Sequence, residues 1–232
     1  PACLPAPAAI SPRLTVSMPV SWRSWPRACA RRPTRRQVLT SRHLQELVNA
    51  RSAAKCDITA LQNRSKTATT ALLRGELNRL VRRLEQHVER LDKGIERRVG
   101  EDPQLYRKAE ILTSIPGIGR VTALALMAGM DELGSCSGKQ AAMLAGLAPI
   151  ANDSGARTGR RSIRAGRPAP RRALYMAALS ACRYNPALAR FADTLKAAGK
   201  PAKVILVAVM RKLLVLANCL LSHDRLWTPN PP

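Results

Sequence analysis

The stretch LRGELNRLVRRLEQHVERLDKGIERRV, residues 73–99, decides the fold, because its apolar side chains recur every three or four positions. That spacing places them on one face of an α-helix and gives the seam expected of a coiled coil. The seam comprises Leu73, Leu77, Leu80, Leu84, Val88, Leu91, Ile95 and Val99. Charged residues fill the other faces, so this helix is expected to be structural and to expose a solvated surface.

A second helical stretch, Ser41–Lys66, is expected to pack antiparallel against the first. Residues 41–100 would then form a helical hairpin, or a stalk that joins copies of the chain into a homo-oligomer. Gly100 and Pro103 end this region, and residues 104–222 are predicted to form a helical domain with almost no strand signal. Its helices are expected near Gln104–Ser114, Arg120–Met130, Lys139–Ala145, Pro170–Cys182, Pro186–Ala198 and Pro201–Leu221. The predicted fold class is therefore all-α.

Two flanking segments lack helical or strand periodicity. Residues 1–40 are rich in Pro and Arg and contain no acidic residue, which predicts a disordered basic arm. The alternative is a segment translated from a shifted frame, because the chain opens with Pro and its composition changes near Gln37. Residues 223–232 are expected to be a tail.

Charge narrows the class of partner. The 232 residues include 39 Lys and Arg against 15 Asp and Glu, a formal net charge of +24, which favours a polyanion. Aromatic residues make up only 3%, so modules that stack bases on aromatic side chains are not expected. The six cysteines are scattered without a CxxC pair, and the acids have helix-surface spacing. No metal site is therefore predicted, and the expected compartment is the reducing cytoplasm.

The most apolar run, Val204–Leu221, is interrupted by Arg211 and Lys212. It therefore predicts a buried helix, and no membrane partner is expected.

The first specific motif is Ile115-Pro116-Gly117-Ile118-Gly119, followed by Arg120. It resembles the turn of a helix-hairpin-helix element, which presents backbone amides and a helix N-terminus to a phosphate. Pro116, Gly117, Gly119 and Arg120 are therefore candidate nucleic-acid contacts that are independent of base sequence. The alternative is a compact turn between helices that binds nothing.

The second motif is the basic loop between Ala148 and Arg167, together with the residues that follow it. No acid occurs between Asp153 and Asp193. Guanidinium groups suit phosphate oxygens, and glycines let the backbone approach a ligand. The candidate contacts are Arg157, Arg160, Arg161, Arg164, Arg167, Arg171 and Arg172. The alternative is a solvated surface loop.

Within this loop, Asn152-Asp153-Ser154-Gly155 has the composition of a simple turn. Attack of a serine hydroxyl on a phosphodiester would need proton removal and stabilisation of the pentacoordinate phosphate, which nearby arginines can supply. Ser154 is the candidate nucleophile, and Ser162 is the fallback.

Eight short blocks now occur in order along the chain. They are Ile115–Gly119, Gly146–Pro149, Asp153–Gly155, Gly159–Arg161, Gly166–Arg167, Arg172–Ala178, Arg183–Pro186 and Gly199–Pro201. Together they resemble the C-terminal domain of the insertion-sequence-110 family transposases, relatives of the Piv-type DNA invertases. The resemblance covers about Ala109–Leu221, and the helical stalk before it also fits the family.

The resemblance implies DNA strand exchange during transposition, in which Ser154 forms a covalent phosphoserine link, guided by a structured bridge-type RNA of the element. In this family an N-terminal RuvC-like domain supplies an acidic tetrad that binds divalent metal. The arm before the stalk contains no carboxylate, so Mg²⁺ is expected only with a domain missing from this chain. The chain is thus expected to be a shortened transposase, bound to the bacterial nucleoid, with little recombinase activity alone.

Two alternatives stay open. A non-catalytic nucleic-acid-binding protein could use the same turn and basic loop without chemistry. An RNA-binding protein of the ribosomal type would fit the charge but would leave the ordered blocks unexplained.

Overall fold

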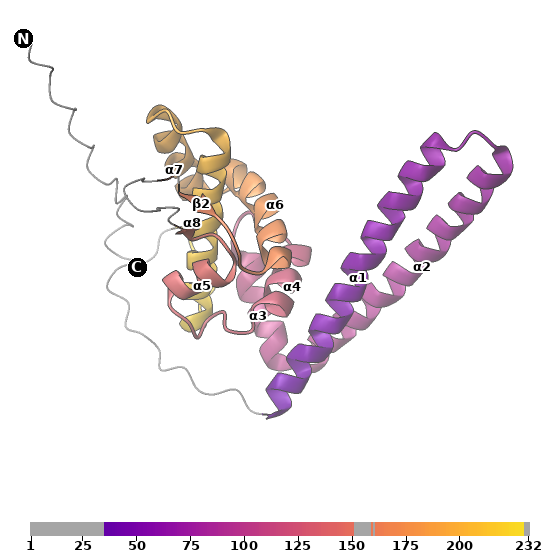
Figure 1. Cartoon of the computed structure of the whole chain (residues 1–232). Helices are drawn as coiled ribbons and strands as arrows, with labels where there is room; N and C mark the ends of the chain where they lie inside the picture. The colour runs from indigo at the N-terminus through magenta and orange to yellow at the C-terminus, as the bar shows by residue number, and fades with distance from the viewer. Residues whose placement is uncertain (1–34, 151–158, 160, 230–232) are drawn as a thin grey trace, which may run out of the picture. The chain divides into compact units, whose positions relative to one another are not determined.

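The computed structural model describes residues 35–150, 159 and 161–229, with side chains from Ser41 onward, and its helices all lie in one compact unit, Ala28–Trp227. The helices are α1 (Arg35–Thr67), α2 (Ala71–Glu101), α3 (Pro103–Ser114), α4 (Arg120–Gly129), α5 (Gly138–Leu144), α6 (Pro168–Tyr184), α7 (Pro186–Ala197) and α8 (Ala202–Ser222) (Figure 1). The predicted all-α class is confirmed. The six helices expected after residue 103 are present, with their ends within two residues of the predicted positions.

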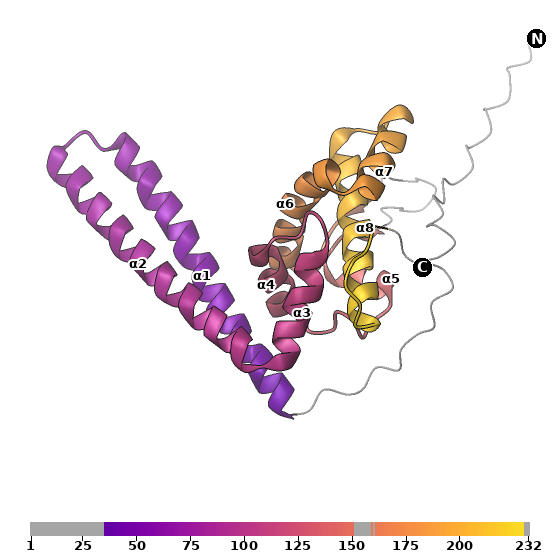
Figure 2. The same cartoon turned by 180° about the vertical axis from the view of Figure 1, so that it is seen from behind.

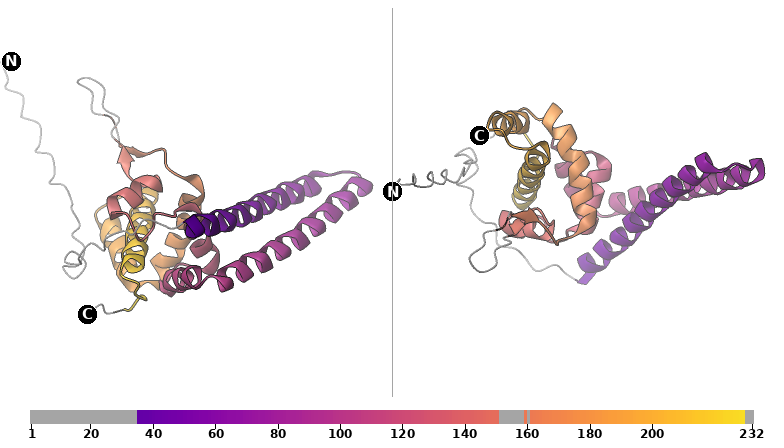
Figure 3. Two further views of the ribbon diagram at one scale, coloured as in Figure 1. Left: turned by 90° about the horizontal axis from the view of Figure 1, so that it is seen from below. Right: turned by 45° about the horizontal axis from the view of Figure 1, so that its top comes forward.

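The first two helices form the predicted hairpin. They lie side by side in every view (Figures 1 and 3), and their shared core contains Ala54, Ile58, Val81 and Val88, with Leu61 and Leu84 packed against it. The seam differs from the predicted one near the turn, where Leu73 and Leu80 are exposed. Val88, Ile95 and Val99 of the predicted seam are buried, as is Val81, which the predicted seam did not include.

Helix α1 also begins earlier than expected. The predicted disordered arm ran to residue 40, but the helix starts at Arg35. No proline follows Pro33 until Pro103, so nothing in the sequence interrupts helical hydrogen bonding over this stretch.

Among the remaining six helices (Figure 2), α8 contacts four, α3, α5, α6 and α7, whereas α4 packs against α3 and α6. Helix α8 buries Val209, Met210, Leu213, Leu214, Leu216, Ala217 and Leu220. By length and composition alone it could cross a membrane, with a mean hydropathy of 2.2 in its most apolar window. Its contacts with four neighbours make it the core helix of this domain, as the sequence predicts.

Two helix starts show how local sequence sets these boundaries. Asp102 Oδ1 accepts hydrogen bonds from the backbone N–H groups of Gln104 and Leu105, at 2.9 and 3.3 Å, and Pro103 occupies the first helical position of α3. Asn185 and Pro186 repeat this arrangement at the start of α7. A side-chain acceptor before a proline satisfies backbone donors that would otherwise lack partners, so each helix begins sharply.

The sequence predicted a basic loop between Ala148 and Arg167. The structure differs, because this basic segment contains two short strands. Its two ends pair as short antiparallel strands, β1 (Pro149–Ile150) and β2 (Ser162–Ile163), with Pro149 opposite Ile163. This pairing places Ile150 opposite Ser162.

Candidate nucleic-acid interface

The turn between α3 and α4 has one buried side. Ile115 and Ile118 are almost fully buried, and the N–H of Ile118 donates to the Ile115 carbonyl at 3.0 Å. Gly117 has a φ of +103°, and a Cβ added there would lie 2.6 Å from Cβ of Ala181 on α6. Gly117 is therefore required by backbone conformation and by helix packing, independently of any ligand.

The other side of this turn is open. Gly119 is exposed, has nothing within 4 Å of an added Cβ, and precedes α4 without a side-chain cap. The first N–H groups of a helix lack intrahelical partners and lie at the positive end of its dipole. The open side can therefore accept an anion, as the motif predicts.

Arg120, the cation at this turn, already holds a carboxylate. Its Nε and Nη2 donate to the two carboxylate oxygens of Glu96, at 3.0 and 2.5 Å. Because Glu96 belongs to α2, this two-bond ion pair ties the hairpin to the turn. The guanidinium of Arg120, which the sequence predicted to contact a phosphate, is thus paired with a carboxylate in this structure.

The predicted loop residues fall into three groups. Ser154, Arg157 and Arg160 lie outside the described residues, so their predicted roles stay predictions. Arg161 and Arg164 are exposed, and Nε of Arg164 donates to Oγ of Ser162 at 3.2 Å. Neither arginine has an acidic partner among the described residues, so both remain available to a phosphate.

Arg167 is anchored within the domain. Its guanidinium donates to both carboxylate oxygens of Glu132, at 2.8 and 2.7 Å, and to the Gly129 carbonyl at the end of α4, at 2.8 Å. The hydrogen bonds from Arg167 lower the pKa of Glu132, although partial burial opposes the shift. The same pairing raises the pKa of Arg167. This side chain therefore fastens the end of the basic segment to α4.

Gly166, next to Arg167, also helps to hold the end of the basic segment in place. Gly146 and Gly166 both have positive φ, at +66° and +72°, and their backbones lie face to face. A Cβ added to Gly166 would lie 2.2 Å from the Gly146 nitrogen, and one added to Gly146 would lie 2.2 Å from the Ala165 carbonyl oxygen. Gly166 thus allows two segments of the chain to meet, which differs from the ligand approach predicted for the loop glycines.

Arg171 and Arg172 lie in the first turns of α6. Arg171 donates to the Ala165 carbonyl at 2.8 Å and supports the same segment end. Arg172 is exposed and makes no hydrogen bond or ion pair among the described residues. Arg172 is therefore freer than Arg171 to contact a ligand.

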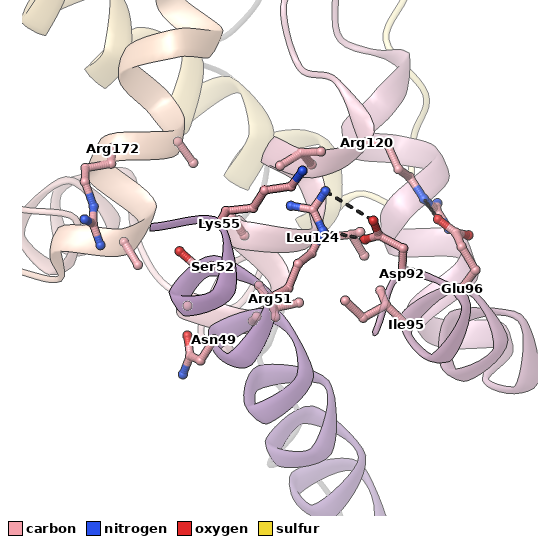
Figure 4. Close-up of a pocket in the computed structure, with 17 residues that line it drawn as sticks. Asn49, Arg51, Ser52, Lys55, Asp92, Ile95, Glu96, Arg120, Leu124 and Arg172 are labelled. Atoms are coloured by element: carbon pink, nitrogen blue, oxygen red, sulfur yellow. Dashed lines mark hydrogen bonds and ion pairs between the residues drawn. The ribbon is translucent and has the colours of Figure 1, made fainter. Parts of the chain in front are cut away.

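The structure brings two predicted contacts from separate motifs into one cleft. Arg120 and Arg172 both line a cavity of about 520 Å³ bounded by α1, α2, α4 and α6 (Figure 4). Two further cations line it from α1, namely Arg51 and Lys55. The sequence did not predict these two, because α1 was interpreted only as the structural mate of the seam. Their spacing of four residues on one helical stretch is the signal that could have indicated a shared face.

A comparison with known protein families gives a match in this same region of the chain. Residues 109–193 match the model of the transposase IS116/IS110/IS902 family. The chain therefore carries a transposase domain of the IS116/IS110/IS902 family. The match runs from within α3 to within α7 and includes the turn, the basic segment and Arg172.

Curated relatives agree with the IS116/IS110/IS902 assignment. The chain is 33% identical over 150 residues to the pilin gene-inverting protein of Moraxella bovis, covering 62% of this chain and 46% of that protein. It is 31% identical over 185 residues to the insertion element IS900 uncharacterized 42 kDa protein of Mycobacterium paratuberculosis, covering 75% of this chain and 45% of that protein. The chain thus spans slightly less than half the length of these relatives.

Within the part of this transposase domain and hairpin that the structure describes, no group of three or more His, Cys, Asp or Glu side chains could hold a metal ion. Glu132 is committed to Arg167, and its neighbour Asp131 has a pKa raised by partial burial, against a hydrogen bond from Ser41.

Proposed function

We propose that this chain binds DNA for the transposition of an insertion sequence. The observation that carries the proposal is the open N-terminus of α4 at Gly119, lying inside the matched transposase domain. Backbone amides there and exposed side chains such as Arg161 and Arg164 would contact phosphates without reading bases.

The test is titration of the purified chain against labelled duplex DNA of random sequence at several salt concentrations. We expect binding that weakens steeply with salt, by about 10³-fold or more between 50 and 200 mM if six or more phosphates are engaged. Absence of binding at the lowest salt would contradict the proposal.

We also propose that Ser154 is the nucleophile of DNA strand exchange, on the strength of the Asp-Ser-Gly block within the matched domain. Its Oγ would form a bond to phosphorus while the bond from phosphorus to a deoxyribose oxygen breaks. The hydroxyl proton leaves to a base, and the departing sugar oxygen takes up a proton. The product is a phosphoserine link between protein and DNA.

The two candidate serines provide a matched test. In a complex with a full-length relative, the Ser154→Ala variant is expected to lose the covalent adduct and to keep DNA binding. The Ser162→Ala variant is expected to keep the adduct. The adduct is detected as a band that survives denaturing electrophoresis. Loss with Ser162→Ala alone would move the role to the fallback serine. No adduct from any form, with binding intact, would favour the non-catalytic alternative.

Two partners complete the proposal. A structured RNA encoded by the element guides the recombination, which sequencing of RNA copurified with the chain would detect. Mg²⁺ would serve the reaction through the acidic tetrad of a RuvC-like domain, so DNA binding by this chain alone should not change when EDTA is added. We further propose that the protein acts on the bacterial nucleoid.

The hairpin is proposed to join copies of the chain. Leu72, Leu73 and Leu80 are 75, 52 and 45% exposed on α2, whereas Val81, Val88, Ile95 and Val99 of the same helix are buried. Covering such side chains contributes favourably to association. Sedimentation should show a homo-oligomer that Leu73→Ser with Leu80→Ser converts to monomer, and a monomeric wild type would contradict this.

A further inference from the structure

The cleft between α1, α2, α4 and α6 carries an excess of positive charge. Its lining contains four cations and two carboxylates. Both carboxylates are in use, because Asp92 pairs with Arg51 and Glu96 pairs with Arg120. Lys55 and Arg172 line the same cavity and have no ion-pair partner among the described residues. Two positive charges therefore face this cleft without compensation.

Small residues make up part of the cavity lining. Ala125, Ala128 and Gly129 from α4 and Ala169 and Ala173 from α6 line it together with the larger Val48, Ile95, Val121 and Leu124, and no aromatic residue does. Small side chains let a ligand backbone approach the helices closely, and the absence of aromatic rings removes base stacking as a mode of binding. This combination suits a chain of phosphates and sugars.

The cleft is also continuous with the turn that precedes α4. Arg120 and Val121, the first two residues of that helix, line it, and Val121 is 59% exposed. Figure 4 shows Lys55 between Arg172 on one side and the Arg120–Glu96 pair on the other. The first turn of α4 therefore shares this cavity with Lys55 and Arg172.

We propose that this cleft holds one phosphodiester backbone of duplex DNA, with Lys55 and Arg172 as phosphate contacts, so that the hairpin takes part in DNA binding. The inference rests on the proposed DNA-binding function and extends it to α1, which lies before the matched transposase domain. Unpaired cations that line a cleft with walls of low dielectric constant attract a polyanion more strongly than the same charges spread over an open surface.

Glu96 opposes this binding in the free protein. Its carboxylate makes two hydrogen bonds to Arg120, as a phosphate would. DNA entering the cleft would compete with Glu96 for this guanidinium. Removing the carboxylate should therefore strengthen binding, which is an effect that a damaged fold cannot imitate.

The first arm of the test compares two pairs of cations. Lys55→Ala with Arg172→Ala is measured beside Arg82→Ala with Arg83→Ala, two exposed arginines of α2 that do not line the cleft. Loss of two phosphate contacts lowers the salt slope by about 1.8, so a fourfold rise in salt should cost the cleft variant about tenfold less affinity than it costs the wild type. The matched pair should keep the slope of the wild type.

The second arm compares two acids of α2. Glu96→Ala should bind DNA about threefold to fivefold more tightly, whereas Glu89→Ala should change affinity less. Glu89 is exposed two turns earlier on α2 and lines no part of the cleft. Thermal unfolding of all four variants identifies any that fails to fold.

The outcomes separate this inference from the function on which it rests. If the wild type does not bind duplex DNA, the proposed function fails and the inference fails with it. If the wild type binds but the two cation pairs lose affinity equally, or the two acid variants gain equally, only the cleft assignment is overturned. Stronger competition by duplex RNA than by duplex DNA would also overturn it.

Discussion

Arg167 and Arg172 lie five residues apart in one basic segment, yet they serve different purposes. Arg167 donates to Glu132 and to the Gly129 carbonyl, and so fastens the start of α6 to α4. Arg172 projects from the first turns of α6 into a cleft and has no acidic partner among the described residues. A basic segment is therefore not a uniform ligand surface, because some of its cations form ion pairs and hydrogen bonds within the protein.

The largest effect is expected at the anchored end. Gly166→Ala would place a Cβ 2.2 Å from a backbone nitrogen at a φ of +72°. We expect a loss of on the order of 3 kcal/mol in unfolding free energy, because backbone atoms cannot move aside cheaply. Urea unfolding followed by circular dichroism measures it.

The control is Gly94→Ala in α2, where an added Cβ meets nothing within 4 Å. A helical glycine replaced by alanine should stabilise by about 0.5–1 kcal/mol. Equal behaviour of the two variants would show that the Gly146–Gly166 contact does not hold the segment.

The next effect concerns the anchoring ion pair. Arg167→Ala leaves Glu132 and the Gly129 carbonyl without their donor, and should cost about 1–2 kcal/mol in unfolding free energy. Arg172→Ala should change it by less than about 0.5 kcal/mol. A similar loss from both variants would contradict the division between anchored and available cations.

This ion pair also predicts a pH dependence. Arg167 lowers the pKa of Glu132, so the pair stabilises the folded state above the ordinary glutamate pKa of about 4.3 and loses that contribution as the pH falls through the lowered value. The stability difference between wild type and Arg167→Ala should therefore shrink in acid. A difference that is constant from neutral pH to pH about 3 would assign the effect to packing.

The sequence predicted the helices well and the roles of single cations less well. Helix boundaries follow from local signals, such as Asp102 before Pro103, which act within one turn of the chain. The partner of Arg167 lies 35 residues earlier and that of Arg120 lies 24 residues earlier, so neither pairing is set by local sequence. Lys55 was missed for the same reason, because only the packing of α1 beside α4 brings it into the cavity that Arg172 lines.

The smallest effect is expected at Ala165, which adopts a φ of +57° beside Gly166. Alanine pays a steric cost in this conformation, and glycine pays a greater entropic cost on folding. Ala165→Gly should therefore stabilise by only about 0.5 kcal/mol. Thermal unfolding would show a small rise in Tm, and a fall would mean that the Ala165 side chain contributes packing.

The most direct test measures DNA affinity and unfolding free energy together for Arg167→Ala and Arg172→Ala. We expect opposite outcomes for the two variants. Arg172→Ala should lose affinity and lower the salt slope by about 0.9 while its stability is unchanged. Arg167→Ala should lose stability and keep the salt slope of the wild type. If Arg167→Ala lowers the slope, or if Arg172→Ala leaves it unchanged, the division of labour between the two arginines is wrong.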